Sequence, residues 1–427
     1  MRLWTPLLLM ILLSAVAVNG QTPKPLTLRQ AQDIALQNHP RVAAAKFRSQ
    51  AAAEQPTEYK SALLPTFSTF MTAAGAGDNT RIAAGGLNNP TILSRYSNGL
   101  SMTQLITDFG RTNNLVRSSK LKASAEEQNV ESTREDILLQ VDQAYFTALE
   151  AQAVEKVAEE TVKERQVVLD QVQQLTNSKL KSSLDLSFAK VNLATAQLLL
   201  LTAQNDVKSA YAQLTAALGS TDDQDYALAD EPLSPEPPPD LASLVGQAIR
   251  NRPDLLTLQF NRESAMAFAK AEHGLKMPSI SVIGAIGYTP FHVSTLSNVY
   301  TAAGVNVSIP IFTGHLYTAR AAEADFRAQA ADKDFQALQN QVTRDVRIAW
   351  LNANNAYKQV DLTAQLVNQA AESLDLAKTR YDLGLSSIVE LNQAQLNMTQ
   401  AELEHARARY EYQIRYATLQ HHIGALH

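Results

Sequence analysis

The sequence predicts a mainly α-helical chain in which two very long antiparallel helical hairpins are joined to four β-strands of a membrane barrel. Three observations predict this fold class. The 427 residues contain an internal duplication, each half has long runs without proline or glycine, and each half has two short segments that alternate apolar and polar residues. A repeat of this size indicates two copies of one structural unit, which must be recognised before single residues are interpreted.

The duplication is continuous over most of the chain. Residues 98–219 align with 303–424 at a constant offset of 205 positions, so that Gly219 falls on Gly424 and Tyr145 on Trp350. Further upstream the offset is 213, because Pro65 corresponds to Pro278. The offset changes between Pro65 and residue 98 in the first half, and between Pro278 and residue 303 in the second half. This change predicts loops of different length at roughly 75–95 and 288–298, since exposed loops tolerate such changes.

The repeat suggests a division into four parts. Residues 1–20 read as a signal peptide, with Arg2 before an apolar stretch and small residues at Ala17 and Gly20; a retained anchor helix is the alternative. Residues 21–229 form the first repeat and 241–427 the second. Between them, residues 230–240 contain five prolines and predict a stiff, extended linker.

Composition excludes several classes of protein. The chain has no cysteine, which rules out disulfides and a lipid attached to cysteine. Its net charge of −5 gives no reason to expect nucleic acid as a partner. After the signal there is no uninterrupted apolar run of about 18 residues, so no further membrane-spanning helix is expected.

Long helices are predicted from residue 110 to about 175 and from 183 to 218, and again over about 315–380 and 388–423. These runs consist largely of strong helix formers, and Gly219 and Gly424 follow them as natural helix ends. Apolar residues at positions 137, 141, 144, 148 and 151 have the spacing of a coiled-coil seam. The short breaks at 175–179 and 381–385 predict that each pair of helices forms an antiparallel hairpin.

Short segments after Pro65 and Pro278 have the period of β-strands. Ile280, Val282 and Ile286 share one face of the first such segment in the second half, and Val305, Val307, Ile309 and Ile311 share a face of the next. In the first half Leu100, Met102 and Ile106 alternate with Ser101, Thr103 and Thr107. This pattern is typical of a lipid-facing barrel strand, although a half-buried strand of a soluble sheet has the same pattern.

Four strands are too few to close a barrel, and an open sheet edge is unstable in lipid. Bacterial single-chain barrels have about eight strands or more. If these strands cross a membrane, several copies of the chain must share one barrel, and three copies would supply twelve strands.

The chain resembles the TolC-like outer membrane efflux proteins, the exit ducts of tripartite efflux pumps and type I secretion systems. The resemblance rests on the repeat openings at 26–40 and 244–254, the strand exits at 103–110 and 308–314, and the hairpin tip at 381–391. It implies a homotrimer with a 12-stranded barrel in outer membrane lipid and a helical tunnel in the periplasm. It also implies two protein partners at the tunnel end, a periplasmic adaptor protein and an inner-membrane transporter. Drugs, metals and polypeptides all remain open as cargo.

The resemblance also suggests a gate. In that family carboxylates form a ring near the hairpin tips, and the matching positions here are Glu390 and Gln393; Asp185 is the repeat partner of Glu390. Three copies of Glu390 would form an anionic ring that filters cations, while the alternative is a solvated carboxylate at a helix start. The family's tip arginine is replaced by Ser386. The expected adaptor contact comprises Tyr381, Leu383, Gly384, Leu385 and Ser386, and the first tip differs by having Lys179 and Lys181.

No enzyme chemistry is predicted from the sequence. Asp108-Phe109-Gly110 copies a kinase tripeptide without the other kinase motifs, and there is no phosphate-binding loop or metalloprotease motif. His421, His422 and His427 do not have the spacing of a metal site with three ligands, so an exposed tail is expected rather than a metal site. We therefore expect no cofactor and no metal. A soluble periplasmic coiled-coil scaffold or adaptor is the alternative function.

Overall fold

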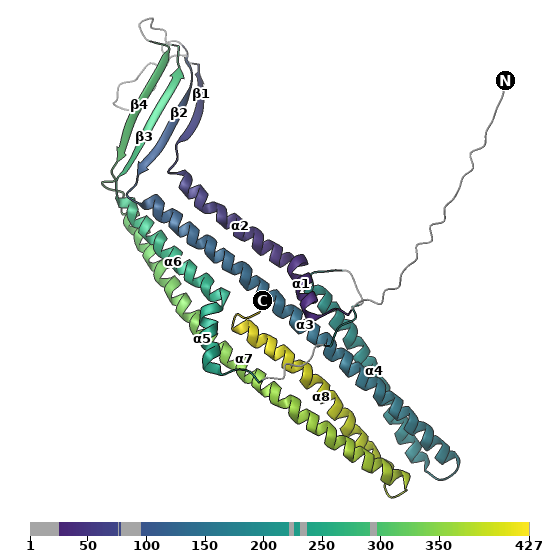
Figure 1. The fold of residues 1–427 in the computed structure, drawn as a ribbon. Coiled ribbons are helices and arrows are strands. Elements are labelled where there is room, and N and C mark those ends of the chain that lie inside the picture. Colours follow the sequence, from purple (N-terminus) through teal and green to yellow (C-terminus); the bar gives the residue numbers. More distant parts are fainter. Residues whose placement is uncertain are drawn as a thin grey trace, which may run out of the picture.

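The computed structural model describes residues 25–75, 77, 95–221, 226–230, 237–290 and 297–426. A sheet lies at one end, and helices run from it to two hairpin tips at the other end (Figure 1). The segment predicted as a signal peptide, most of both predicted loops and residues 231–236 of the predicted linker lie outside the described residues.

The elements of the first half recur in the second half. The first half contains α1 (Leu28–Asn38), α2 (Pro40–Ser61), β1 (Thr66–Ala74), β2 (Arg95–Thr107), α3 (Arg111–Asn177) and α4 (Ser183–Ala217). The second contains α5 (Leu241–Asn251), α6 (Pro253–His273), a 3-10 turn at Gly274–Lys276, β3 (Ser279–Tyr288), β4 (Val299–Ser308), α7 (Leu316–Asp382) and α8 (Ile388–His422). Both α3 and α7 have 67 residues, about 100 Å at 1.5 Å per residue, and both α4 and α8 have 35. The duplication in the sequence is thus a duplication of the fold.

Local sequence signals set the helix starts. Thr27 accepts a hydrogen bond from the Gln30 amide, and the Gln30 side chain accepts one from the Thr27 amide, which is a capping box for α1. His39 caps α2, whose first residue is Pro40, a residue suited to this position because its missing N–H would have no helical partner. Asp240 caps α5 in the same way as a side-chain acceptor.

The glycine that follows α4 contacts the joint between α1 and α2, and the glycine that follows α8 contacts the joint between α5 and α6. Gly219 has φ +76° and Gly424 φ +65°. A Cβ on Gly219 would lie 2.8 Å from the Cα of His39, and one on Gly424 would lie 3.0 Å from the carbonyl carbon of Asn251. Each repeat therefore requires glycine at this position for both backbone conformation and space.

The four strands form one antiparallel sheet in the order β1-β2-β3-β4. Residues directly opposite one another share a face. The register aligns Phe67 with Met102, Leu100 with Ile286, and Val282 with Val305, so the predicted alternation yields one largely apolar face. The opposite face pairs Ser68 with Ser101, whose hydroxyl oxygens lie 2.8 Å apart.

The sheet is open. Among the described residues, β1 and β4 each have only one strand partner, so both edges present unpaired backbone groups. The last strand is also shorter than its alternation predicts. It ends at Ser308, and Ile309 and Ile311 lie beyond it, because Pro310 has no N–H for a ladder hydrogen bond.

The helical cores of the two repeats are equivalent. Ile137, Val141 and Tyr145 of α3 pack against α1 and α4, while Val342 and Val346 of α7 pack against α5 and α8. The Tyr145 hydroxyl lies 2.8 Å and 2.6 Å from the carbonyl oxygens of Leu26 and Ala229, and the indole N–H of Trp350 donates to Pro239. Tyr145 thus holds the two ends of the first repeat, and Trp350 holds the end of the linker, as expected of packing residues.

Among the described residues, α4 is the one helix long and apolar enough, by length and composition, to cross a membrane. It packs along α3 as the counterpart of α8, which packs along α7 (Figure 1). Its outward apolar side chains are Leu184, Phe188, Val191, Leu198 and Leu201.

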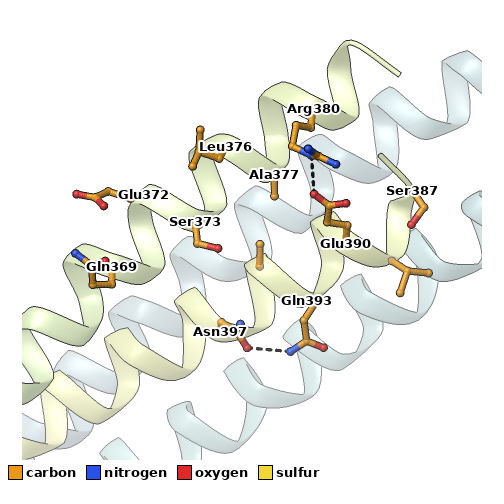
Figure 2. Close-up of a pocket in the computed structure, with 12 residues that line it drawn as sticks. Gln369, Glu372, Ser373, Leu376, Ala377, Arg380, Ser387, Glu390, Gln393 and Asn397 are labelled. Atoms are coloured by element: carbon orange, nitrogen blue, oxygen red, sulfur yellow. Dashed lines mark hydrogen bonds and ion pairs between the residues drawn. The ribbon is translucent and has the colours of Figure 1, made fainter. Parts of the chain in front are cut away.

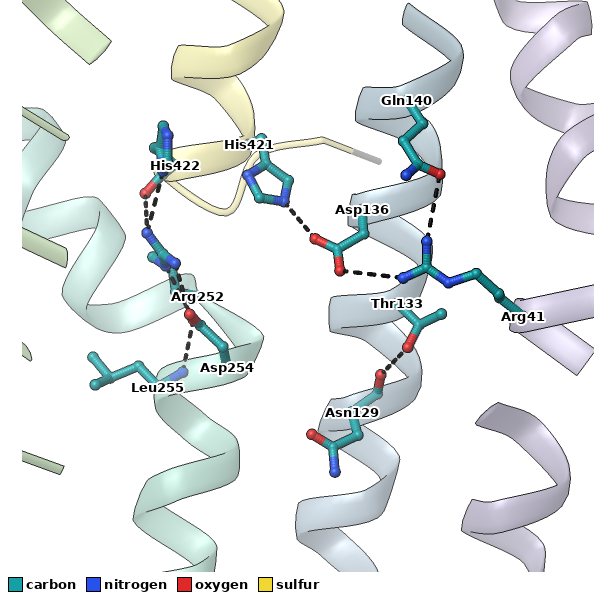
Figure 3. Close-up of polar contacts among 10 residues, drawn as sticks. All are labelled: Arg41, Asn129, Thr133, Asp136, Gln140, Arg252, Asp254, Leu255, His421 and His422. Atoms are coloured by element: carbon teal, nitrogen blue, oxygen red, sulfur yellow. Dashed lines mark hydrogen bonds and ion pairs between the residues drawn. The ribbon is translucent and has the colours of Figure 1, made fainter. Parts of the chain in front are cut away.

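A polar junction joins the two halves where the end of α8 meets α3 and the starts of α2 and α6 (Figure 3). Asp136 of α3 lies 3.0 Å from Nε2 of His421 at the end of α8 and 4.0 Å from Nη2 of Arg41 in α2. Arg252 pairs with Asp254 at 2.6 Å and also approaches His422. The expectation of an exposed histidine tail is wrong for His421 and His422, because both lie in the last turn of α8, packed between the halves. His427 lies outside the described residues.

Candidate functional site: the hairpin tips

The two hairpin tips have the same backbone. The Leu180 amide donates to the carbonyl of Leu175, and the Leu385 amide donates to that of Arg380, both at 2.8 Å. These hydrogen bonds end α3 and α7 in the same motif, which needs a left-handed residue. That residue is Gly384, with φ +71°, in the second tip and Lys179, with φ +61°, in the first.

The second tip presents apolar side chains to solvent. Leu383 and Leu385 are each 68% exposed, and a Cβ on Gly384 would meet no atom within 4 Å. Ser386 is half-buried, and its hydroxyl has no hydrogen-bond partner among the described residues. These four of the five expected contact residues form the turn itself.

The fifth residue, Tyr381, lies inside. Its side chain is buried in a cluster with Val172 and Ala189 of the first hairpin and Ile388 and Leu391 of α8. Burial raises the pKa of the phenol, and the charges of Asp185 and Asp382 raise it further. Tyr381 therefore supports the tip and joins the two hairpins instead of forming exposed surface.

Two polar contacts reinforce this junction between the hairpins. The Lys181 ammonium lies 4.0 Å from the centre of the Tyr381 ring, within the range of a cation–π contact. The Gln171 amide donates to a carboxylate oxygen of Asp382 at 3.1 Å. We call Gln171, Lys181, Tyr381 and Asp382 the tip link, because they connect α3 and its following turn to the end of α7.

Glu390 lies on the wall of a groove between α7 and α8, close to the tip (Figure 2). The groove has a volume of about 840 Å³. Glu390 pairs with Arg380 across the turn, with 2.9 Å between Nε and Oε1, and both side chains are about half exposed. Gln393 lies one turn further on and donates to Asn397 at 2.9 Å. The predicted gate residues Glu390 and Gln393 thus line one groove.

Asp185 has a different role from its repeat partner. Its carboxylate accepts a hydrogen bond from the Ser182 amide, and its own amide donates to the Ser182 hydroxyl, both at 3.1 Å. This capping box fixes the start of α4. Ser387, the counterpart of Ser182, makes no side-chain cap on α8, and Glu390 turns to Arg380 instead. The repeat counterpart of Arg380 is Leu175, so only the second hairpin contains this ion pair.

Sequence reasoning missed Arg380 and the contacts of the tip link. Comparing the two repeats position by position would have shown Arg380, because a leucine at one tip and an arginine at the other indicate different environments. The tip link could not be found this way, because it depends on which faces of two hairpins meet.

The arrangement can act through charge and shape. The groove near the tip presents Glu372, Arg380 and Glu390 to solvent, and the described residues hold no group of three or more metal-ligating side chains. A ring of such grooves would attract or repel ions according to the balance between the two carboxylates and the guanidinium.

The fold and the tips together define a class of protein: an outer membrane channel with a short β-sheet per chain and a long periplasmic helical extension. The family model described as "Outer membrane efflux protein" matches residues 32–220 and 244–425. The chain belongs to this family.

Individual proteins agree with this assignment. The chain is 23% identical to the outer membrane protein TolC of Escherichia coli (strain K12) over 389 residues, which cover 88% of this chain and 78% of that protein. Among solved structures, the outer-membrane channel OprN superposes with a TM-score of 0.81 at 19% identity, covering 93% of this chain and 90% of that one. The outer membrane protein VceC from Vibrio cholerae has a TM-score of 0.79 at 19% identity, covering 93% and 96%. The predicted family, outer membrane location and fold class are confirmed.

Proposed function

We propose that three copies of this chain form a passive exit duct, in which twelve strands close a barrel in the outer membrane and the helices form a periplasmic tunnel. An inner-membrane transporter supplies the energy, and a periplasmic adaptor protein joins it to the tunnel end. The relative from E. coli and the structural neighbours are outer membrane proteins, which favours this function over a soluble periplasmic scaffold.

The open, two-faced sheet is the observation that supports the proposal most strongly. Its apolar face suits lipid and its polar face suits a water-filled interior. Unpaired strand edges cost several kcal/mol per backbone group in hydrocarbon, so the edges of β1 and β4 must be paired by other copies.

The repeat also predicts where the copies meet along the helices. Inside one chain, α3 packs against α8. Because α7 is the counterpart of α3 and α4 the counterpart of α8, the equivalent contact joins α7 of one copy to α4 of the next. The side chains on these two helices should then resemble a buried interface left uncovered.

Exposure of paired residues follows this expectation. Leu403 of α8 is 8% exposed, whereas its counterpart Leu198 in α4 is 64% exposed. Phe146 of α3 is 5% exposed, whereas its counterpart Leu351 in α7 is 58% exposed. Apolar side chains of this size each contribute about 1.5–3 kcal/mol when fully buried. A second copy on each side would cover both rows.

At the tunnel end we assign the gate to the tips. In this proposal the groove with Glu390 and Gln393 lies at the narrow end of the tunnel, where three Glu390–Arg380 pairs form the charged ring. Asp185 fixes the start of α4 beside the tip link. The contacts of the tip link must break when the two tips separate. Leu383, Gly384, Leu385 and Ser386 provide the adaptor contact, with Tyr381 supporting it from inside.

Engineered cysteines test the assembly directly, since the chain has no native cysteine. Leu403 shares a core cluster with Ala158, so their counterparts Leu198 and Thr363 should meet between copies. In outer membranes that contain the double variant Leu198→Cys/Thr363→Cys, a short bis-maleimide reagent should give covalent dimers and trimers on denaturing gels.

Each single-cysteine variant is the matched control and should remain monomeric on the same gels. Absence of intermolecular products from the double variant, with both thiols shown to be reactive, would contradict the proposed arrangement of copies.

A further inference from the structure

A cavity of about 510 Å³ lies where α3, α4 and α8 meet, and its lining shares Val389 and Gln393 with the groove of Glu390. Its volume is within the range of small-molecule sites, roughly 300–1,000 Å³. All of its walls come from one chain. They include Arg165 of α3, Asn192 and Leu199 of α4, and Asn392 and Leu403 of α8.

Arg165 is an unusual residue for such a cavity. It is 7% exposed, and its Nη1 atom has no hydrogen-bond partner among the described residues. Its Nη2 atom reaches the hydroxyl of Thr399 at 3.4 Å, which is a long hydrogen bond. Arg165 has no ion pair among the described residues, and the opposite charge that acts on its guanidinium is that of the adjacent Glu164.

A buried guanidinium without a carboxylate is costly. Removing a charge from water costs several kcal/mol in a protein unless a partner of opposite charge replaces the solvent. Arginine keeps its charge under these conditions. A partner is therefore expected, and the cavity provides the space for one.

The remaining walls define the chemistry of that partner. Phe188, Leu199, Leu396 and Leu403 supply an apolar surface. The Asn392 side chain has a buried oxygen without a hydrogen-bond partner, and turning the amide would direct its N–H groups at an anion. A planar carboxylate matches the two parallel N–H donors of a guanidinium, and an apolar body matches the walls.

We propose that this cavity is a binding site for a carboxylic acid with an apolar body, whose carboxylate pairs with Arg165. The bound acid contacts both hairpins of the chain, because α3 and α4 form one and α8 belongs to the other. The site occurs once per chain. The repeat counterparts of Arg165 and Thr399 are Ala370 and Ala194, so the equivalent place between copies has no cation.

The test uses the full-length protein extracted in detergent, with 1-naphthylacetate as the probe and the uncharged 1-naphthylacetamide as its matched control. Binding is measured by equilibrium dialysis, with empty micelles subtracted. We expect saturable binding of the acid at one site per chain, and at least about tenfold weaker binding of the amide, since one lost charge-assisted pair is worth about 1.5–3 kcal/mol.

Arg165→Gln should weaken binding of the acid about tenfold or more and leave the amide unchanged. Lys190→Gln removes an exposed cation of α4 outside the cavity and should leave both affinities unchanged. Equal binding of acid and amide by the unmodified protein, or full acid binding by a folded Arg165→Gln variant, would overturn the proposal. The comparison of acid with amide remains decisive even if the variant fails to fold. Because the site lies within one chain, the test is independent of the proposed duct function.

Discussion

At the residue scale, glycine decides how each long hairpin returns to the body of its repeat. Gly219 and Gly424 combine a left-handed backbone with contact to the joint between two short helices. No other residue satisfies both requirements. This explains why the sequence repeat keeps glycine at these two positions, whereas the glycine of the second tip is replaced by lysine in the first.

Gly219→Ala should therefore destabilise the protein by about 2 kcal/mol or more, since strained left-handed residues cost about 1–3 kcal/mol and the new Cβ would press on the His39 backbone. Thermal unfolding followed by circular dichroism measures the effect. Gly246→Ala is the matched control. Gly246 lies within α5, where a Cβ would make an ordinary 3.6 Å contact with the flexible end of the Arg250 side chain, so alanine there should raise stability by about 0.5–1 kcal/mol. Equal responses of the two variants would refute this account of Gly219.

Asp142 is a buried carboxylate in α3. Burial raises its pKa from 3.8 to about 7, although the Gln32 amide donates to it at 2.6 Å. Because the pKa is higher in the native than in the unfolded state, the native state binds the proton more tightly. The resulting stabilisation is complete below about pH 4 and is lost as the pH rises to about 7.

Asp142→Asn should remove this pH dependence, since asparagine keeps the acceptor for Gln32 and has no charge. At pH 8 we expect the variant to be more stable than the unmodified protein by about 2–4 kcal/mol, and at pH 4 nearly equal to it. Unfolding measured at both pH values provides the check. Asp170→Asn, at an exposed position of the same helix, should change little at either pH. A stability gain at pH 8 from Asp170→Asn as large as that from Asp142→Asn would contradict the assignment to burial.

At the element scale, the two hairpins have identical lengths and turns but different electrostatics. The first tip uses its carboxylate to cap a helix, whereas the second pairs its carboxylate with Arg380. The tip that contains Glu390 also presents Leu383, whose repeat counterpart is Ser178, whereas Leu385 and its counterpart Leu180 are both exposed. We therefore expect the two tips to contribute differently to gating and to the adaptor contact.

Opposite changes at the ion pair test the gate. Glu390→Gln should reduce the cation preference of the channel in a planar bilayer, because it removes the carboxylate ring. Arg380→Gln should increase the cation preference, because it leaves the carboxylate uncompensated. Asp375→Asn, on α7 but outside the groove, is the control. Unchanged ion selectivity in both charge variants would remove the ring from the account and leave the fold as described.

Leu385 and its repeat counterpart Leu180 offer a matched pair for the adaptor contact. They are 68% and 71% exposed, so aspartate at either position should fold normally. We expect Leu385→Asp to abolish dye efflux in cells that contain the pump and the adaptor, and Leu180→Asp to reduce it less. Normal efflux by Leu385→Asp would show that docking lies elsewhere.

The long helices and the strands were predictable from the sequence because the same pattern occurs in both copies of the repeat. The boundaries of α3, α4, α7 and α8 follow directly from proline, glycine and the coiled-coil spacing. Errors arose where one residue's chemistry overrode a pattern, as Pro310 did at the end of β4. The burial of Tyr381 and the pairing of Glu390 depend on how two hairpins meet, which no local pattern records.

At the scale of the whole molecule, one chain is an incomplete structure. Its sheet has two open edges, and α4 and α7 expose the counterparts of residues that are buried between α3 and α8. The same arrangement repeated around an axis would satisfy both the edges and the helix faces. The proposed assembly of several copies thus rests on features of a single chain.

The most direct measurement of this central claim is the mass of the particle extracted from outer membranes in mild detergent, by light scattering corrected for bound detergent. We predict the mass of three chains, in a complex that separates into single chains on heating. A single-chain particle recovered from the soluble periplasmic fraction would contradict the shared barrel and favour the scaffold alternative.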